Sequence, residues 1–133
     1  MMSIDLQTDA ILLLLLLFLI ITFLQSGLDK LFDFKGNLAW LQEHFSKTVF
    51  KSAVPLLLST ITIMELATAI LAIIGSLLIV LREDTSIAMY AAIMGSLTLL
   101  MLLLGQRMAK DYEGAKTIVI YFVPCVFLLF LLT

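Results

Sequence analysis

The chain has 133 residues, of which 62% are hydrophobic and 14% are charged, and its mean hydropathy is +1.16. A soluble domain carries about 25% charged residues, so this composition excludes a soluble globular protein and indicates an integral membrane protein. The net charge is −2 and the eight basic residues form no dense cluster, so we expect no nucleic-acid partner.

Four apolar runs are long enough, or nearly long enough, to cross a bilayer core of about 30 Å. They predict transmembrane helices at about residues 10–28, 53–81, 86–106 and 112–133, within a single domain that covers 1–133. The predicted fold class is therefore an all-α membrane protein, a four-transmembrane-helix bundle. Because the start carries Asp5 and Asp9 but no basic residue or cleavage site, we expect the first helix to be retained.

The end of the first span changes from apolar to polar. Its polar residues follow at spacings of three and four, which places them on one face of a continuing helix: Thr22, Gln25, Ser26, Asp29 and Asp33. This stripe predicts that the end of the span faces polar groups. Gln25, Asp29 and the neighbouring Lys30 are therefore candidates for contacts with a ligand or for a proton relay.

A short amphipathic helix is predicted between the first and second spans. Gly36 and Asn37 indicate a break followed by an N-cap, and the helix extends over about residues 37–48. Trp40 and nearby phenylalanines favour a position in the membrane interface. His44 is the single histidine, and an interfacial packing role is favoured over a role in binding or proton transfer.

The second span contains Glu65, far from either end. An ionisable group at that depth is costly in hydrocarbon and is by default a candidate functional residue. Its helix face carries small and hydroxylated residues, which predict a packing seam together with Gly95 of the third span: Thr62, Thr68, Ala69, Ala72 and Ser76.

Two interpretations of Glu65 stay open at this point. In the first, the carboxyl group is a structural latch held by Thr62 one turn back, by Gln25, or by a tyrosine or arginine of another span. In the second, Glu65 belongs to a proton relay or contacts a ligand. Burial favours the neutral form of a carboxyl group, which could then donate a hydrogen bond.

The loop before the fourth span is the most polar stretch of the chain. Arg107 and Asp111 are four residues apart, which on an exposed helix is an ordinary surface pair. In the alternative, Arg107 reaches inward to Asp29, Glu65 or an anionic ligand group, with Gln106 and Tyr112 beside it. This loop, the end of the first span and the start of the second are expected to meet at one side of the membrane.

Metal and cofactor sites receive little support from the sequence. Cys125 is the single cysteine, and no group of histidine, cysteine or acidic residues has the spacing of metal ligands, so we expect no metal site. No cofactor is evident, although a quinone is possible because it needs only hydrogen-bonding groups in an apolar cleft.

The basic residues predict the orientation. Seven of the eight lie in the first and third loops, which are therefore expected in the cytoplasm, with both termini outside. The inner (cytoplasmic) membrane of a bacterium is the expected location.

The stretch Ser26-Gly27-Leu28-Asp29-Lys30-Leu31-Phe32 resembles the "sG-x-x-KL" signature of the DoxX family of small four-helix membrane proteins. The similarity continues at residues 40–45, 65–75 and 105–115, and departs at Ala69, where the family often has glycine. The founding branch is described as the membrane subunit of a thiosulfate:quinone oxidoreductase, but most members have no assigned activity. The resemblance therefore implies the fold more strongly than the reaction.

Two functions remain as hypotheses. The favoured one is a non-catalytic subunit, or an assembly or stabilising factor, of a larger membrane complex. Its partners would be the lipid bilayer and other membrane proteins or further copies of itself, and the chain would not be an enzyme by itself. The alternative is a quinone-linked membrane subunit of an oxidoreductase, with Glu65 in an intramembrane site.

Overall fold

The computed structural model describes residues 6–133, with side chains for 9–133. Its helices are α1 (Leu6–Phe32), α2 (Phe34–His44), α3 (Val54–Arg82), α4 (Ser86–Met108) and α5 (Tyr112–Leu132), and the short 3₁₀ helix η1 (Lys51–Ala53) precedes α3. Helices α1, α3, α4 and α5 are long and apolar enough to cross a membrane. The predicted four-helix membrane bundle, with a short helix between the first and second spans, is confirmed.

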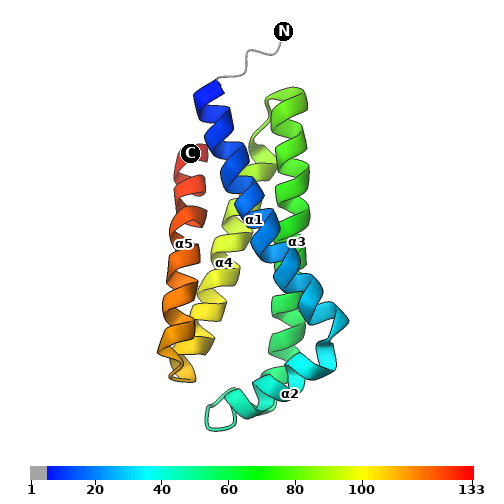
Figure 1. The fold of residues 1–133 in the computed structure, drawn as a ribbon, viewed down its shortest axis with the longest axis vertical. Coiled ribbons are helices and arrows are strands. Elements are labelled where there is room, and N and C mark those ends of the chain that lie inside the picture. The colour runs from blue at the N-terminus through cyan, green and yellow to red at the C-terminus, as the bar shows by residue number, and fades with distance from the viewer. Residues whose placement is uncertain (1–5) are drawn as a thin grey trace.

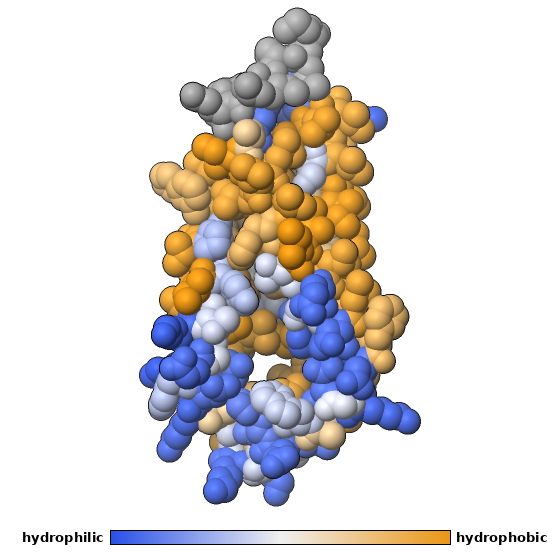
Figure 2. Space-filling model, in the orientation of Figure 1, coloured by the Kyte–Doolittle hydropathy of each residue, from blue (hydrophilic) through white to orange (hydrophobic). Residues whose placement is uncertain are grey.

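The four long helices alternate in direction, so the loops gather at two ends (Figure 1). Helix α2 and the turn between α4 and α5 lie at one end, which we call the basic end. The C-terminus and the turn between α3 and α4 lie at the other. On the face shown in Figure 2, polar side chains concentrate at the basic end, whereas the rest of that face is largely apolar. Such a distribution suits a bundle whose apolar surface faces lipid.

Helix α1 buries one face of its leucine-rich run. Leu12, Leu16, Leu19 and Phe23 are at most 3% exposed, and their spacing of three and four residues matches the period of a helix. Leu14, on another face, is 66% exposed. A uniform leucine run contains no signal for which face is buried, so the packing against α3 decides it.

Helices α3 and α4 approach each other closely through small residues. A Cβ atom added at Gly75 would lie 2.8 Å from both the backbone N and the Cα of Ala88. Thr62, Thr68 and Ser76 donate their hydroxyl hydrogens to backbone carbonyls four residues earlier, at 2.7 to 2.8 Å. These hydroxyl groups therefore need no partner on another helix.

The start of α2 differs from the prediction. Asp33 is the N-cap, and its Oδ1 accepts a hydrogen bond from the backbone N–H of Gly36 at 3.3 Å. Gly36 and Asn37 therefore lie inside the helix instead of marking its start. The helix ends at His44, and turns rather than helix occupy residues 45–50. The capping carboxylate binds an otherwise unpaired N–H group, which outweighs the helix-breaking tendency of Gly36.

Asp84 stabilises the start of α4 in the turn outside the spans. Its Oδ1 accepts hydrogen bonds from the backbone N–H of Ser86 at 3.0 Å and from the Ser86 hydroxyl at 2.8 Å. These bonds hold the pKa of Asp84 below its ordinary value of 3.8. Because the folded-state pKa is the lower one, the stabilisation is present above pH 3.8 and is lost as the pH falls through the folded-state pKa.

We therefore expect Asp84→Ala to lower the thermal unfolding midpoint of the detergent-solubilised protein at neutral pH. The difference from the parent should shrink when the pH falls below 3.8. Circular dichroism at a series of pH values measures both effects. Thr85→Ala is the control, because Thr85 occupies the N-cap position without a side-chain capping hydrogen bond. An Asp84→Ala effect that does not change with pH would contradict this account.

Candidate functional site

Glu65 is buried in the bundle, where it forms an ion pair with Lys30. The residue is 2% exposed, and its Oε1 lies 2.9 Å from Nζ of Lys30. It lies about 17 Å along α3 from Val54. The sequence placed Glu65 and Lys30 among the candidates but did not pair them.

Local geometry at the end of α1 explains why Lys30 can reach Glu65. A Cβ added at Gly27 would lie 2.7 Å from Cδ2 of Leu66 and 3.4 Å from its backbone N, so α1 and α3 are close together here. Ser26 and Lys30 are one helical turn apart, and the Lys30 ammonium donates a hydrogen bond to the Ser26 hydroxyl at 2.7 Å. Ser26 thereby holds the ammonium on the face that meets α3.

The ion pair is nearly shielded from solvent. The Lys30 side chain is 18% exposed and the Glu65 side chain 3%. Nζ of Lys30 is close to Oε1 of Glu65, and within the described part of the chain no other donor binds Oε1. A carboxylate offers about four acceptor positions. Glu65 therefore keeps acceptor capacity inside an apolar bundle.

Two partners suggested by the sequence do not reach Glu65. Thr62 donates its hydroxyl hydrogen to the carbonyl of Leu58 at 2.7 Å. Arg107 does not turn inward: it is exposed, and its guanidinium carbon lies 4.9 Å from the ring centre of Tyr112, which is 55% exposed. A guanidinium that stacks on an aromatic ring outside the bundle stays hydrated. If Arg107 turned inward, its guanidinium would lose that hydration.

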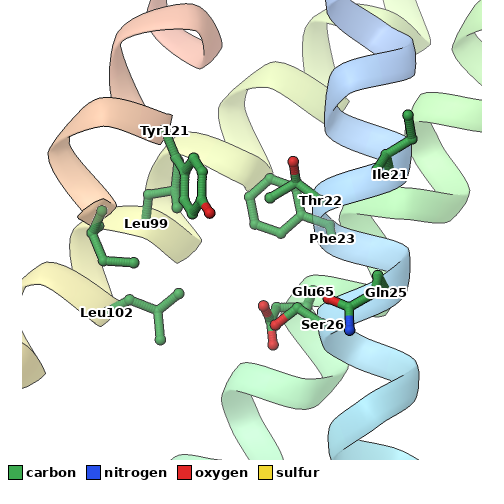
Figure 3. Close-up of a pocket in the computed structure, with 10 residues that line it drawn as sticks. Ile21, Thr22, Phe23, Gln25, Ser26, Glu65, Leu99, Leu102 and Tyr121 are labelled. Atoms are coloured by element: carbon green, nitrogen blue, oxygen red, sulfur yellow. The ribbon is translucent and has the colours of Figure 1, made fainter. Parts of the chain in front are cut away.

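A first cavity, cavity 1, lies between α1, α3, α4 and α5 and has a volume of about 340 Å³. Glu65 lies in its wall, opposite Leu102, and the Tyr121 ring stands at the α5 side (Figure 3). Gln25 and Ile21 also line it, and both are exposed. Cavity 1 therefore opens on the outer surface of the bundle beside α1.

A second cavity, cavity 2, lies at the basic end and has a volume of about 370 Å³. Its wall is mostly apolar and aromatic, with Trp40, Phe45 and Phe50 from the segment between α1 and α3. Lys30 lines cavity 2 and not cavity 1, whereas Glu65 lines cavity 1 and not cavity 2. The ion pair thus contributes its acceptor to the wall of cavity 1 and its donor to the wall of cavity 2.

His44 connects α2 to the turn between α4 and α5. Its Nε2 lies 3.1 Å from Oε1 of Gln106 and 3.5 Å from Oδ2 of Asp111. The imidazole is also stacked on Trp40, with ring centres 4.5 Å apart. Asp111 additionally accepts a hydrogen bond from the N–H of Gly114 at 2.9 Å and so caps α5. These contacts close the basic end around cavity 2.

The remaining candidate residues take different positions. Asp29 is exposed and lines neither cavity; its backbone carbonyl accepts a hydrogen bond from the Asn37 amide at 3.5 Å. Arg107 is likewise exposed and lines neither cavity, so neither charged group contributes to the cavity walls. Within the described residues, no group of three metal-ligating side chains is close enough to hold a metal ion.

The predicted seam residues divide by burial. Thr62, Thr68, Ala69, Ala72 and Gly95 are buried, and Ser76 is half-buried. A Cβ added at Gly95 would lie 3.1 Å from Sγ of Cys125 and 3.2 Å from Cγ2 of Thr68. Gly95 therefore sits where α3, α4 and α5 come together.

The sequence did not assign Ser26 or Gln106 a contact at the site, although both lie in its predicted polar stretches. Ser26 was recognised as part of the polar stripe, and its spacing from Lys30 is the signal that predicts their contact. Gln106 binds His44 across 62 positions of sequence. No local pattern could have indicated this contact, because it depends on how the helices meet.

No family model matches this chain, and no curated protein and no solved structure is similar enough to count as a match.

Proposed function

We propose that this four-span membrane protein is a subunit that binds a lipid-soluble ring compound with carbonyl acceptors, a quinone, in cavity 2. One observation carries the proposal: the Lys30 ammonium stands in the wall of an otherwise largely apolar and aromatic cavity. An ammonium has three protons to donate, and Ser26 and Glu65 engage two of its sides. The remaining donor suits a ligand carbonyl oxygen.

The size and chemistry of cavity 2 support this class of ligand. Its volume of about 370 Å³ lies within the ~300–1,000 Å³ of small-molecule sites, which are mostly apolar with a few placed polar groups. Asn37 and Gln106 supply further side-chain amides in its wall. The aromatic rings of Trp40 and Phe45 provide flat surfaces against which a planar ring can stack.

The role proposed for the chain is to bind and position the quinone within a larger assembly. The resemblance to the DoxX family supports this reading, because its founding branch is described as the membrane subunit of a quinone-reducing enzyme. In this proposal the basic end faces the cytoplasm, following the distribution of lysine and arginine. His44, whose Nε2 lies 3.1 Å from Oε1 of the wall residue Gln106, is the group proposed to exchange protons between water and the site.

The second candidate is a non-catalytic assembly or stabilising factor. The lipid-facing side of α3 favours it, because bulky apolar residues are exposed along its whole length: Leu56, Ile63, Ile70, Ile74, Leu77 and Leu81. The small residues of α3 and α4 do not favour the assembly-factor candidate. Gly75 and Gly95 pack inside the chain's own bundle and are not available to a partner.

Tryptophan fluorescence tests the quinone proposal directly, because Trp40 is the single tryptophan and lines cavity 2. We expect menadione, a quinone without a tail, to quench Trp40 in a saturable way when titrated into the detergent-solubilised protein. The double variant Lys30→Met/Glu65→Met removes the donor without leaving a lone buried charge. Its apparent affinity should be at least about tenfold weaker, since a hydrogen bond from a charged donor contributes ~1.5–3 kcal/mol.

Lys35→Met is the matched control, because Lys35 is an exposed lysine at the same end that lines neither cavity. It should bind menadione like the parent. Quenching that rises linearly with menadione, with one slope for all three proteins, would mean simple partitioning into the detergent. That result would remove the quinone proposal and leave the assembly-factor candidate.

A further inference from the structure

Cavity 1 presents chemistry opposite to that of cavity 2. The charged group in its wall is the Glu65 carboxylate, an acceptor, whereas cavity 2 has the Lys30 ammonium, a donor. The two cavities are adjacent: they share Ser26, Leu102 and Ile118 in their walls and are otherwise lined by different residues. A ligand suited to cavity 1 must therefore donate a hydrogen bond.

The Glu65 carboxylate is ready to accept that bond. Its side chain is 3% exposed and its Oε1 lies 2.9 Å from the Lys30 ammonium, which leaves some of the carboxylate's roughly four acceptor positions free. A ligand hydroxyl in cavity 1 would donate to this remaining acceptor capacity, and that hydrogen bond provides a driving force for binding.

The walls of cavity 1 favour a ring-bearing molecule that comes from the lipid. Phe23 and Tyr121 line it, and in Figure 3 their rings face the cavity from α1 and α5. Ile21, also in the wall, is 63% exposed on the outer surface of α1. The neutral form of a phenol can cross the hydrocarbon, whereas an ammonium ligand, the other strong donor, would be excluded by its charge.

We propose that cavity 1 is a binding site for a lipid-soluble phenol, which reaches it from the bilayer beside Ile21 and donates its hydroxyl hydrogen to the Glu65 carboxylate. The Lys30 ammonium remains the carboxylate's partner in the ion pair while the ligand binds. This site is separate from the quinone proposed for cavity 2, and neither proposal depends on the other.

A reporter at the mouth of cavity 1 tests the proposal. Trp40→Phe removes the natural indole and Ile21→Trp places one in the wall of cavity 1, at a largely exposed position that tolerates a larger side chain. The probe is 4-bromophenol, whose bromine quenches a nearby indole. Its control is 4-bromoanisole, which has the same ring and bromine but no hydroxyl hydrogen. We expect saturable quenching by 4-bromophenol, with an apparent affinity at least tenfold above that of 4-bromoanisole.

Variants of the acceptor complete the test in the same reporter background. In Lys30→Met/Glu65→Met, the apparent affinity for 4-bromophenol should fall to that for 4-bromoanisole. Glu65→Gln should lose less affinity for 4-bromophenol, because its amide oxygen still accepts a hydrogen bond. Equal quenching of the parent reporter by the two probes would overturn the proposal, and so would a preference for the phenol that survives in the double variant. The menadione titration of Trp40 uses another reporter and another cavity, so each proposal can fail without the other.

Discussion

Lys30→Met is expected to destabilise the folded protein by about 3–5 kcal/mol, the usual cost of removing one partner from a buried ion pair. The variant leaves Glu65, with a side chain that is 3% exposed, without its counter-charge in an apolar bundle. The carboxyl group must then stay charged at a high electrostatic cost or bind a proton. Unfolding of the purified protein, followed by circular dichroism against temperature or denaturant, measures the loss.

The double variant decides whether the ion pair or some other feature of Lys30 is responsible. Lys30→Met/Glu65→Met should recover most of the lost stability, because replacing both charges of a buried pair with apolar groups is often neutral or stabilising by ~1–4 kcal/mol. Lys35→Met removes a lysine that is exposed on α2 and should have little effect. If Lys30→Met and Lys35→Met have the same unfolding midpoint, the ion pair contributes nothing to the stability of the fold.

The second large effect is expected at Gly75, in the contact between α3 and α4. In Gly75→Ala the new Cβ would lie 2.8 Å from the backbone N and Cα of Ala88. Backbone atoms cannot turn aside as a side chain does, so the two helices must separate. Overpacking of this kind costs about 1–3 kcal/mol, and Gly75→Leu should cost more. The expected readout is a lower unfolding midpoint for both variants, with leucine below alanine.

Gly105→Ala is the matched control for Gly75→Ala. At that position the nearest atom to an added Cβ is Cζ of the Phe45 ring, at 3.3 Å, and this ring lies outside the helices and can shift. Alanine is also favoured over glycine inside a helix, by about 1 kcal/mol. Gly105→Ala should therefore be neutral or stabilising. Equal destabilisation by the two alanine variants would contradict the assignment of Gly75 to a tight helix–helix contact.

The Lys30–Glu65 ion pair contributes both to the stability of the folded protein and to the two proposed binding sites. Lys30 contributes a donor to cavity 2 and Glu65 an acceptor to cavity 1, while the pair itself joins α1 to α3. A ligand that hydrogen-bonds either group binds the folded state and should raise its unfolding midpoint by mass action. Thermal shifts with menadione and with 4-bromophenol therefore provide a second readout for the two proposed sites.

The sequence by itself determined the class of protein and most of the helices. Four long apolar runs admit few alternatives, because a membrane requires each spanning segment to satisfy its own backbone hydrogen bonds. The small-residue face around Glu65 was also readable, since helical periodicity relates residues on one helix without knowledge of its neighbours. The N-cap at Asp33 was missed, because glycine at position 36 was interpreted as a break in the helix.

Only the tertiary structure decided what touches Glu65 and where the cavities lie. Several polar residues at the basic end could have been its partner, and choosing Lys30 over Arg107 required the relative placement of α1, α3 and α4. That placement depends on how close Gly27 allows α3 to come and on the Ser26 hydroxyl, which orients the ammonium. Contacts between helices depend on shape and distance in three dimensions, and periodicity along one helix contains neither.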